Sequence, residues 1–108
     1  MDQTRRIILC NYLLIMTTII PDLIKQNWNS RGYSFEVFRD PPGQVWADYV
    51  HKTYELVVLA EGEIEVEIEG KVQRPQIDQE VFIPANAVHT VTNVGQRINV
   101  WYYGYSKE

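Results

Sequence analysis

The sequence predicts an all-β protein, built as a two-layer jelly-roll barrel with a short N-terminal extension. Apolar and acidic residues alternate over residues 63–69, and a period of two is typical of a strand with one buried and one solvated face. Short apolar segments, separated by turn-forming residues, continue from residue 33 to residue 105 without a convincing helical period. Residues 56–60 are apolar on both faces, which predicts a strand covered from both sides. Together these patterns favour a sandwich or barrel of short strands.

Residues 1–20 are expected to form the extension, and residues 21–108 a single domain. The apolar run over residues 7–16 is too short to span a bilayer. Its basic start resembles a secretion signal, although no small-residue cleavage site follows. Two alternatives stay open. Either Met16 is the true start and residues 1–15 are an over-extended gene start, or the extension is an arm that packs on the barrel or on a partner subunit.

The remaining elements follow in order along the chain. A short helix is expected within residues 17–30, after Pro21. Residues 64–73 form a hairpin that turns at Gly70, and its row of glutamates is interpreted as the solvated face of a sheet. The other expected strands lie at residues 33–39, 44–51, 55–63, 79–87, 89–96 and 98–105.

The segment Leu56–Ala60 carries a further expectation about assembly. Its side chains are apolar on both faces, and the interior of a barrel can cover only one of them. A facing sheet or a second subunit must then cover the other face. The segment therefore favours a homodimer.

Composition excludes some partners and suggests a compartment. The chain has 108 residues and a net charge of −4, and its arginines are scattered, so no basic patch is expected to hold a nucleic acid. No membrane partner is expected either. The single cysteine, Cys10, cannot form an intrachain disulfide, which fits a reducing compartment and a cytoplasmic location. Cys10 itself is interpreted as an unreactive thiol.

The two histidines are the strongest candidates for chemistry. If the segment from Tyr49 to Glu55 is a strand, then Tyr49, His51, Thr53 and Glu55 lie on one face, and a short loop would still leave His51 near Glu55. His89 follows a turn at residues 84–86. Imidazole and carboxylate groups bind Zn, Fe, Mn, Ni or Cu, and three such ligands leave positions open for water, oxygen or substrate. The alternative is a metal-free barrel in which the three side chains form a buried hydrogen-bonded cluster.

Two motifs resemble those of the cupin superfamily. In the first, Gly43 is followed by five residues, then YVH, three residues, Glu55, six residues and Gly62. In the second, Asp78 is followed by five residues, then PAN, two residues, His89, three residues and Asn93. The short stretch between the motifs is similar to that of small single-domain cupins, the RmlC-like barrels. The resemblance implies a double-stranded β-helix with a divalent transition metal (Fe, Mn, Ni or Zn) held by His51, Glu55 and His89.

The chain departs from the cupin pattern at three positions. Asp78 and Asn86 replace two glycines, and both residue types tolerate left-handed turns. Tyr49 stands where the family has its first histidine ligand. It could bind the metal as a phenolate, hydrogen-bond to a metal-bound water or plug the pocket, and its ordinary pKa near 10 favours one of the last two roles.

The pocket is expected to be apolar around a polar centre, which is typical of a small-molecule site. Val57, Leu59, Val91 and Ile64 or its neighbours should line or floor the barrel, whereas Trp46 should point outward. The aromatic row Trp101, Tyr103 and Tyr105 shares one face of the last strand, opposite Tyr102, and is interpreted as core or interface. Gln44 and Asn93 could either orient ligands or serve the turns.

Two functions are compatible with these residues. The first is a metal-dependent enzyme that acts on a small organic molecule, with Tyr49 or Glu55 as catalytic residues that transfer a proton. The resemblance permits oxygenase, isomerase, dehydratase and decarboxylase chemistry, and the fold does not select among them. The alternative is a non-catalytic module that binds a metal or a small ligand. A storage or purely structural barrel is a third, weaker option.

Overall fold

A helix opens the described part of the chain, as the sequence predicts. The computed structural model of the chain describes residues 21–107, of which residues 21–30 form a helix. Eight strands follow within the described residues: β1 (Glu36–Asp40), β2 (Val45–Tyr49), β3 (Glu55–Glu61), β4 (Ile64–Ile68), β5 (Lys71–Gln73), β6 (Glu80–Ile83), β7 (His89–Asn93) and β8 (Asn99–Tyr105).

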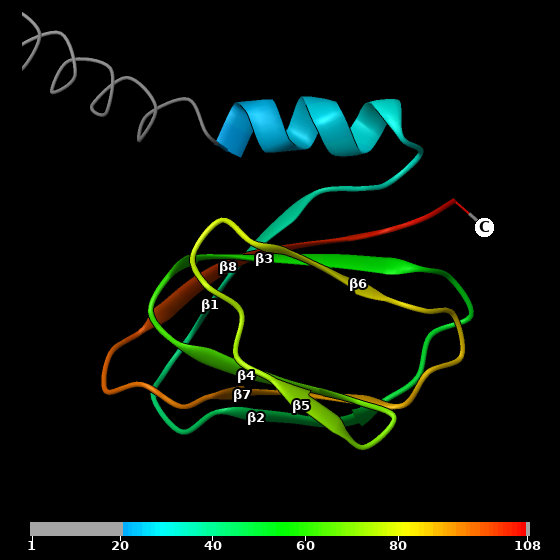
Figure 1. The fold of residues 1–108 in the computed structure, drawn as a ribbon. Helices are drawn as coiled ribbons and strands as arrows, with labels where there is room; N and C mark the ends of the chain where they lie inside the picture. The colour runs from blue at the N-terminus through cyan, green and yellow to red at the C-terminus, as the bar shows by residue number, and fades with distance from the viewer. Residues whose placement is uncertain (1–20, 108) are drawn as a thin grey trace, which may run out of the picture.

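The strands form two four-stranded sheets that face each other. One has the order β1-β8-β3-β6 and the other β2-β7-β4-β5, and all strand pairs are antiparallel. Figure 1 shows them as an upper and a lower layer, with the helix above the first sheet. The expected all-β jelly roll is confirmed.

Left-handed turns hold the two cupin-like motifs in shape. Gly43 and Gly62 have φ angles of 79° and 99°, in the region that glycine enters without steric cost. Asp78 and Asn86, which replace glycines of the pattern, have φ angles of 69° and 65°. The prediction that aspartate and asparagine tolerate these turns is therefore correct.

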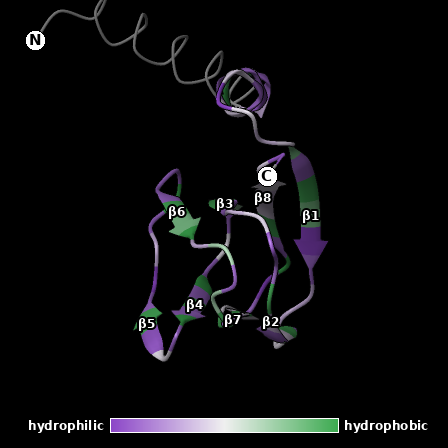
Figure 2. Ribbon diagram, turned by 90° about the vertical axis from the view of Figure 1, so that its right-hand side faces the viewer, coloured by the Kyte–Doolittle hydropathy of each residue, from purple (hydrophilic) through white to green (hydrophobic). Residues whose placement is uncertain are grey.

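The inner faces of the sheets bury the main apolar core. Val57, Leu59, Ile64 and Val91 all lie in it, each at most 4% exposed. Strict alternation along β3 and β4 explains this, because every second side chain points inward. Figure 2 shows hydrophobic residues on strands of both sheets. The expected barrel lining is confirmed.

The outer face of β3 is covered by the chain itself. Trp28 of the helix packs in a second cluster with Leu56, Val58 and Tyr102. Figure 2 shows the helix end-on beside the sheet that contains β3 and β8. The expectation that a facing sheet or a second subunit must cover this face is therefore wrong, because the helix does so. The homodimer stays a prediction, and so does the cytoplasmic location.

Residues 1–20 lie outside the described residues. The interpretations of that segment as a secretion signal, an over-extended gene start or an arm, and that of Cys10, therefore stay predictions. Within residues 21–107, no helix is long and apolar enough to cross a membrane.

Candidate metal centre

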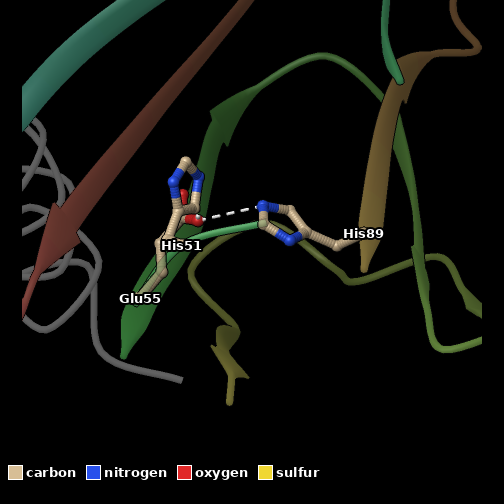
Figure 3. A group of neighbouring side chains, drawn as sticks. All are labelled: His51, Glu55 and His89. Carbon is tan, nitrogen blue, oxygen red and sulfur yellow. Dashed lines mark ion pairs between the residues drawn. The ribbon is translucent and has the colours of Figure 1, made fainter. Parts of the chain in front are cut away.

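The three predicted ligands come from three separate elements. Glu55 is the first residue of β3, and His89 is the first residue of β7. His51 lies in the loop over residues 50–54, where the Asn86 N–H donates a 2.7 Å hydrogen bond to its carbonyl. A continuous strand from residue 44 to residue 51 is therefore wrong, since β2 ends at Tyr49. The expectation that a loop would still keep His51 near Glu55 is correct (Figure 3).

The distances within the cluster suit a shared cation. Glu55 Oε1 lies 3.2 Å from His89 Nε2 and 3.6 Å from His51 Nε2, and one ligand atom from each residue lies within 4.8 Å of the others. Two ligand atoms that are each about 2.1 Å from one metal ion lie roughly 3.0–3.4 Å apart at octahedral or tetrahedral angles. Small side-chain adjustments would therefore bring all three onto one ion.

His89 is held in the orientation that a ligand needs. Its Nδ1 lies 3.0 Å from the Ala87 carbonyl and donates to it, because a carbonyl can only accept. In the neutral ring this leaves the Nε2 lone pair directed at Glu55. Burial lowers the pKa of His89, but the Glu55 carboxylate and the Ala87 carbonyl outweigh burial and raise this pKa above its ordinary value.

Glu55 supplies the observation that tests the fit of a metal. The residue is 4% exposed. Among the described residues, its buried Oε1 receives no hydrogen bond of acceptable geometry, although His89 Nε2 is near. Buried polar atoms without a partner are uncommon and call for an explanation. A cation between Glu55, His51 and His89 would supply the missing partner, so the residues present fit a divalent metal.

Tyr49 lies beside this cluster. Its ring centre is 6.0 Å from that of His51 and 6.4 Å from that of His89, and the residue is 42% exposed. Backbone pairing with β7 places it directly opposite His89. Its ring therefore forms part of the rim of the site, a position compatible with the plugging or hydrogen-bonding role expected for it.

Tyr105 is a polar neighbour that the sequence analysis assigned to core or interface. Its hydroxyl lies 3.4 Å from His51 Nε2, and the two ring centres are 4.8 Å apart. It is the direct backbone partner of Glu55, because β8 pairs with β3. Burial first, and then the Glu55 charge, raise the pKa of Tyr105 well above its ordinary value, so the phenol stays protonated. The sequence of the last strand predicts which face of the sheet Tyr105 lies on. It does not predict which strand pairs with β8 at that position.

Trp46 faces the cavity, which contradicts the expected outward orientation. The pairing of β2 with β7 shifts between Trp46 and Tyr49, and Asp48 between them has a φ of 56°. Such a bulge adds one residue and reverses the alternation. Trp46 and Tyr49 consequently line the same cavity.

The residues around the cluster line a cavity of about 150 Å³ that is partly open to solvent. Tyr49, His51, Glu55 and His89 form its polar side. The remaining wall is aromatic or aliphatic and consists of Phe38, Trp46, Val91, Trp101, Tyr103 and Tyr105. The aromatic row of β8 is thus a wall of the pocket.

Asn93 serves the turns and not the cavity. Its side chain donates to the carbonyls of Asp40 and Arg97 and accepts from the Gly95 N–H. Its backbone N–H donates to the Gln44 carbonyl. Of the two roles left open for Gln44 and Asn93, turn formation is the one observed.

Comparison with known structures gives several similar folds. The cupin domain of Cnp3 from Schizosaccharomyces pombe superposes with a TM-score of 0.66 at 18% identity, covering 71% of this chain and 57% of that one. An RmlC-like cupin from Shewanella frigidimarina gives 0.64 at 14%, covering 71% and 68%. A predicted oxalate decarboxylase from Thermotoga maritima gives 0.64 at 18%, covering 71% and 69%. This chain thus spans less than two thirds of the first of these proteins, and identities this low show the fold alone.

The sequence was compared with curated protein sequences and with profiles of protein families. No curated protein sequence matches the chain. The profile of the cupin domain matches residues 36–103, a range that contains all eight strands except the last two residues of β8. It also contains His51, Glu55 and His89. The chain belongs to the cupin domain family.

Proposed function

We propose that the protein holds a divalent transition metal between His51, Glu55 and His89 and acts on a small organic molecule in the adjoining cavity. The observation that carries this proposal is the buried Glu55 Oε1, which lacks a hydrogen bond and faces two imidazole nitrogens. Two histidines and one carboxylate suit Fe, Mn, Ni or Zn.

The chain's own residues would prepare the site for this ion. Glu55 contributes one negative charge at a position with almost no solvent exposure. The Ala87 carbonyl fixes the tautomer of His89, and the loop hydrogen bond from Asn86 fixes the backbone of His51. When bound, a metal with open positions would polarise the oxygen atoms of a ligand as a Lewis acid or take part in redox chemistry.

Three groups could move a proton in such a reaction. Tyr49 and Glu55 remain our proposed catalytic residues, because both line the cavity. Tyr105 joins them, because its protonated hydroxyl lies within 3.4 Å of His51 Nε2. A ligand that approaches His51 would meet that hydroxyl as a hydrogen-bond donor.

One observation favours a second function, a binding module without catalysis. Apart from the three proposed ligands, the polar groups on the cavity wall in the described part of the chain are phenol hydroxyls and indole nitrogens. Enzymes usually place several polar groups around the reacting atoms. Such a module would hold the same metal and the same kind of ligand.

Metal analysis of the protein purified without a histidine tag tests the proposal. We expect about one transition metal ion per chain in the wild type and less than about a tenth of that in His51→Ala and His89→Ala, because two remaining ligands bind metal weakly. Lys52→Ala, at an exposed residue of the same loop, is the control and should retain its metal. Equal, low metal content in the wild type and both histidine variants would refute the proposal.

Turnover assays separate the two functions. The metal-loaded protein would be mixed with small phenols, diketones and organic acids, and oxygen uptake and product formation would be followed. Turnover that is lost in His89→Ala supports the enzyme. Metal-loaded protein that binds members of the panel without converting them supports the binding module.

A further inference from the structure

The wall of the cavity carries information about its ligand that the metal ligands do not. Seven of its ten residues are aromatic or aliphatic side chains outside the trio of His51, Glu55 and His89. The rings meet at steep angles: Phe38 lies 5.1 Å from Trp46 at 83° and 5.5 Å from Trp101 at 60°. Edge-to-face contacts of this kind are how aromatic rings prefer to pack, and a further ring can join them.

The volume limits the part of the ligand that lies inside the cavity. The cavity measures about 150 Å³, and an apolar protein cavity of about 150 Å³ is known to hold one benzene molecule. A molecule with two fused rings would need a wall residue to move, which is unfavourable in a packed interior, or would leave its second ring outside the cavity without wall contacts. The volume therefore favours a single ring.

The charges set a second limit. None of the residues that line the cavity in the described part of the chain is a lysine or an arginine. The charged groups at the site are then one carboxylate, Glu55, and one divalent ion, a sum of one positive charge. A ligand with one negative charge neutralises it, whereas a dianion leaves an unpaired charge against an apolar wall, which is costly.

We propose that the cavity selects a planar molecule of one ring with two adjacent oxygen atoms and no more than one negative charge. Its oxygen atoms would face His51, Glu55 and His89, and its ring would lie against Trp46 and Trp101. This inference rests on the proposed function, because the trio must hold a metal for the oxygen atoms to be bound.

Isothermal titration calorimetry with two matched pairs of probes tests the inference. Catechol and 2,3-dihydroxynaphthalene share one chelating group and differ by one ring. Tropolone and oxalate both bind through two oxygen atoms, but tropolone is a ring monoanion and oxalate is a dianion. Each affinity for the Zn²⁺-loaded protein is divided by the affinity of the same probe for free Zn²⁺ in the same buffer.

After this correction, we expect catechol to bind at least about tenfold more tightly than the two-ring analogue. We expect the same preference for tropolone over oxalate. Tenfold corresponds to about 1.4 kcal/mol of binding free energy. Equal or reversed preference within either pair would overturn the inference. The comparison of catechol with 2,3-dihydroxynaphthalene is repeated with metal-free protein. It tests size selection even without a metal, since the aromatic wall does not depend on the ion.

A variant with an enlarged cavity gives an independent readout. Trp46→Val removes a partly buried wall side chain that is not a proposed ligand. It should bind 2,3-dihydroxynaphthalene about tenfold more tightly than the wild type does, with unchanged metal content. A melting curve will show whether the variant is folded. If the folded variant still rejects the two-ring probe, then the wall does not select ligands by size. If His51→Ala and the wild type both lack metal, the proposed function fails. A metal-loaded protein that prefers oxalate defeats only the inference.

Discussion

The sheet β1-β8-β3-β6 carries a tryptophan-centred cluster on each face, and the two clusters treat their polar atoms differently. On the outer face, Trp28 packs against Leu56 and Val58. On the inner face, Trp101 packs in the core beside the cavity. Both tryptophans are buried, at 1% and 7% exposure. The difference lies in the hydrogen bonds around them.

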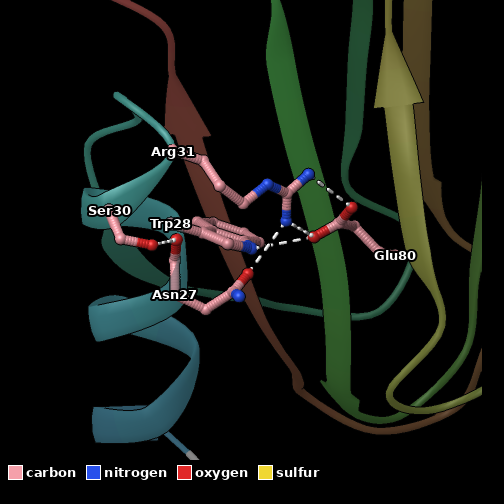
Figure 4. A network of polar contacts seen from close by, with 5 residues as sticks. All are labelled: Asn27, Trp28, Ser30, Arg31 and Glu80. Atoms are coloured by element: carbon pink, nitrogen blue, oxygen red, sulfur yellow. Dashed lines mark hydrogen bonds and ion pairs between the residues drawn. The ribbon is translucent and has the colours of Figure 1, made fainter.

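The outer cluster is closed by a network of polar contacts (Figure 4). The Trp28 Nε1–H donates a 3.0 Å hydrogen bond to Glu80 Oε1. Arg31 donates to both oxygens of the same carboxylate, at 2.9 and 3.0 Å, and to Asn27 Oδ1. This network ties the helix to β6, so that the polar atoms around Trp28 are satisfied and the region serves stability.

The inner cluster contains buried polar atoms that lack hydrogen-bond partners. Within the described residues, Glu55 Oε1, Asp40 Oδ1 and Trp101 Nε1 are buried without a hydrogen-bond partner. Burial raises the pKa of Asp40, although the Trp46 indole, which donates at 3.3 Å, opposes this shift. Native proteins keep such atoms where function requires them, at a cost in stability. The contrast is between a face whose polar atoms are satisfied and a face whose unpartnered polar atoms fit the proposed ligand site.

The largest effect on stability should come from the outer cluster. Trp28→Ala removes a fully buried ring and leaves a cavity between helix and sheet, so we expect the free energy of unfolding to fall by about 3–5 kcal/mol. Urea unfolding measures this. The control is Leu23→Ala, since Leu23 is 46% exposed on the same helix and should change stability by less than about 0.5 kcal/mol. A small loss in Trp28→Ala would mean that the helix does not protect this face.

The inner cluster should show the opposite behaviour. Glu55→Gln exchanges an unpartnered buried carboxylate for a neutral amide of the same shape, so it should abolish metal binding. At pH 8, without metal, its free energy of unfolding should be equal to that of the wild type or about 1 kcal/mol higher. Metal analysis and urea unfolding of metal-stripped protein measure both effects. A clear loss of stability in this variant would mean that Glu55 serves the fold, as in the metal-free cluster considered from the sequence.

The same contrast explains what could be predicted from the sequence. Alternation along β4, the apolar run of β3 and the turn residues Asp78 and Asn86 are local signals, and they predicted the fold correctly. The resemblance of the two motifs to the cupin pattern implied that Glu55 and His89 meet in one cluster, and they do. The alternation, the apolar run and the turns need no knowledge of which strands are neighbours.

Other features depend on tertiary pairing or on a single inserted residue. The helical cover of Leu56 depends on where the chain folds back before β1. The role of Tyr105 depends on the pairing of β8 with β3. The inward position of Trp46 depends on the bulge at Asp48, because one extra residue reverses every later side chain. No periodicity argument detects such a bulge.

The smallest effect on stability should come from the exposed ion pair between Arg31 and Glu80, and it should depend on pH. Arg31 lowers the pKa of Glu80 below its ordinary value of 4.5. A group whose pKa is lowered by folding stabilises the protein above its unfolded pKa and loses that contribution as the pH falls through its folded pKa. Arg31→Met should therefore reduce stability at pH 7 by roughly 0.2–1 kcal/mol, as exposed ion pairs do, and its difference from the wild type should shrink progressively as the pH falls below 4.5 and through the lowered pKa of Glu80.

Salt gives a second way to separate the contribution of the Arg31–Glu80 ion pair from that of the buried Trp28 ring. Arg31 and Glu80 are 41% and 36% exposed at their side chains, so 1 M salt should remove most of the effect of Arg31→Met. The effect of Trp28→Ala rests on packing and should persist in salt. Lys25→Met, at an exposed position of the same helix, controls for the loss of a positive charge. If Arg31→Met lowers stability equally at about pH 2 and at pH 7, then the methylene stem of Arg31 over the Trp28 cluster, and not its charge, stabilises the helix.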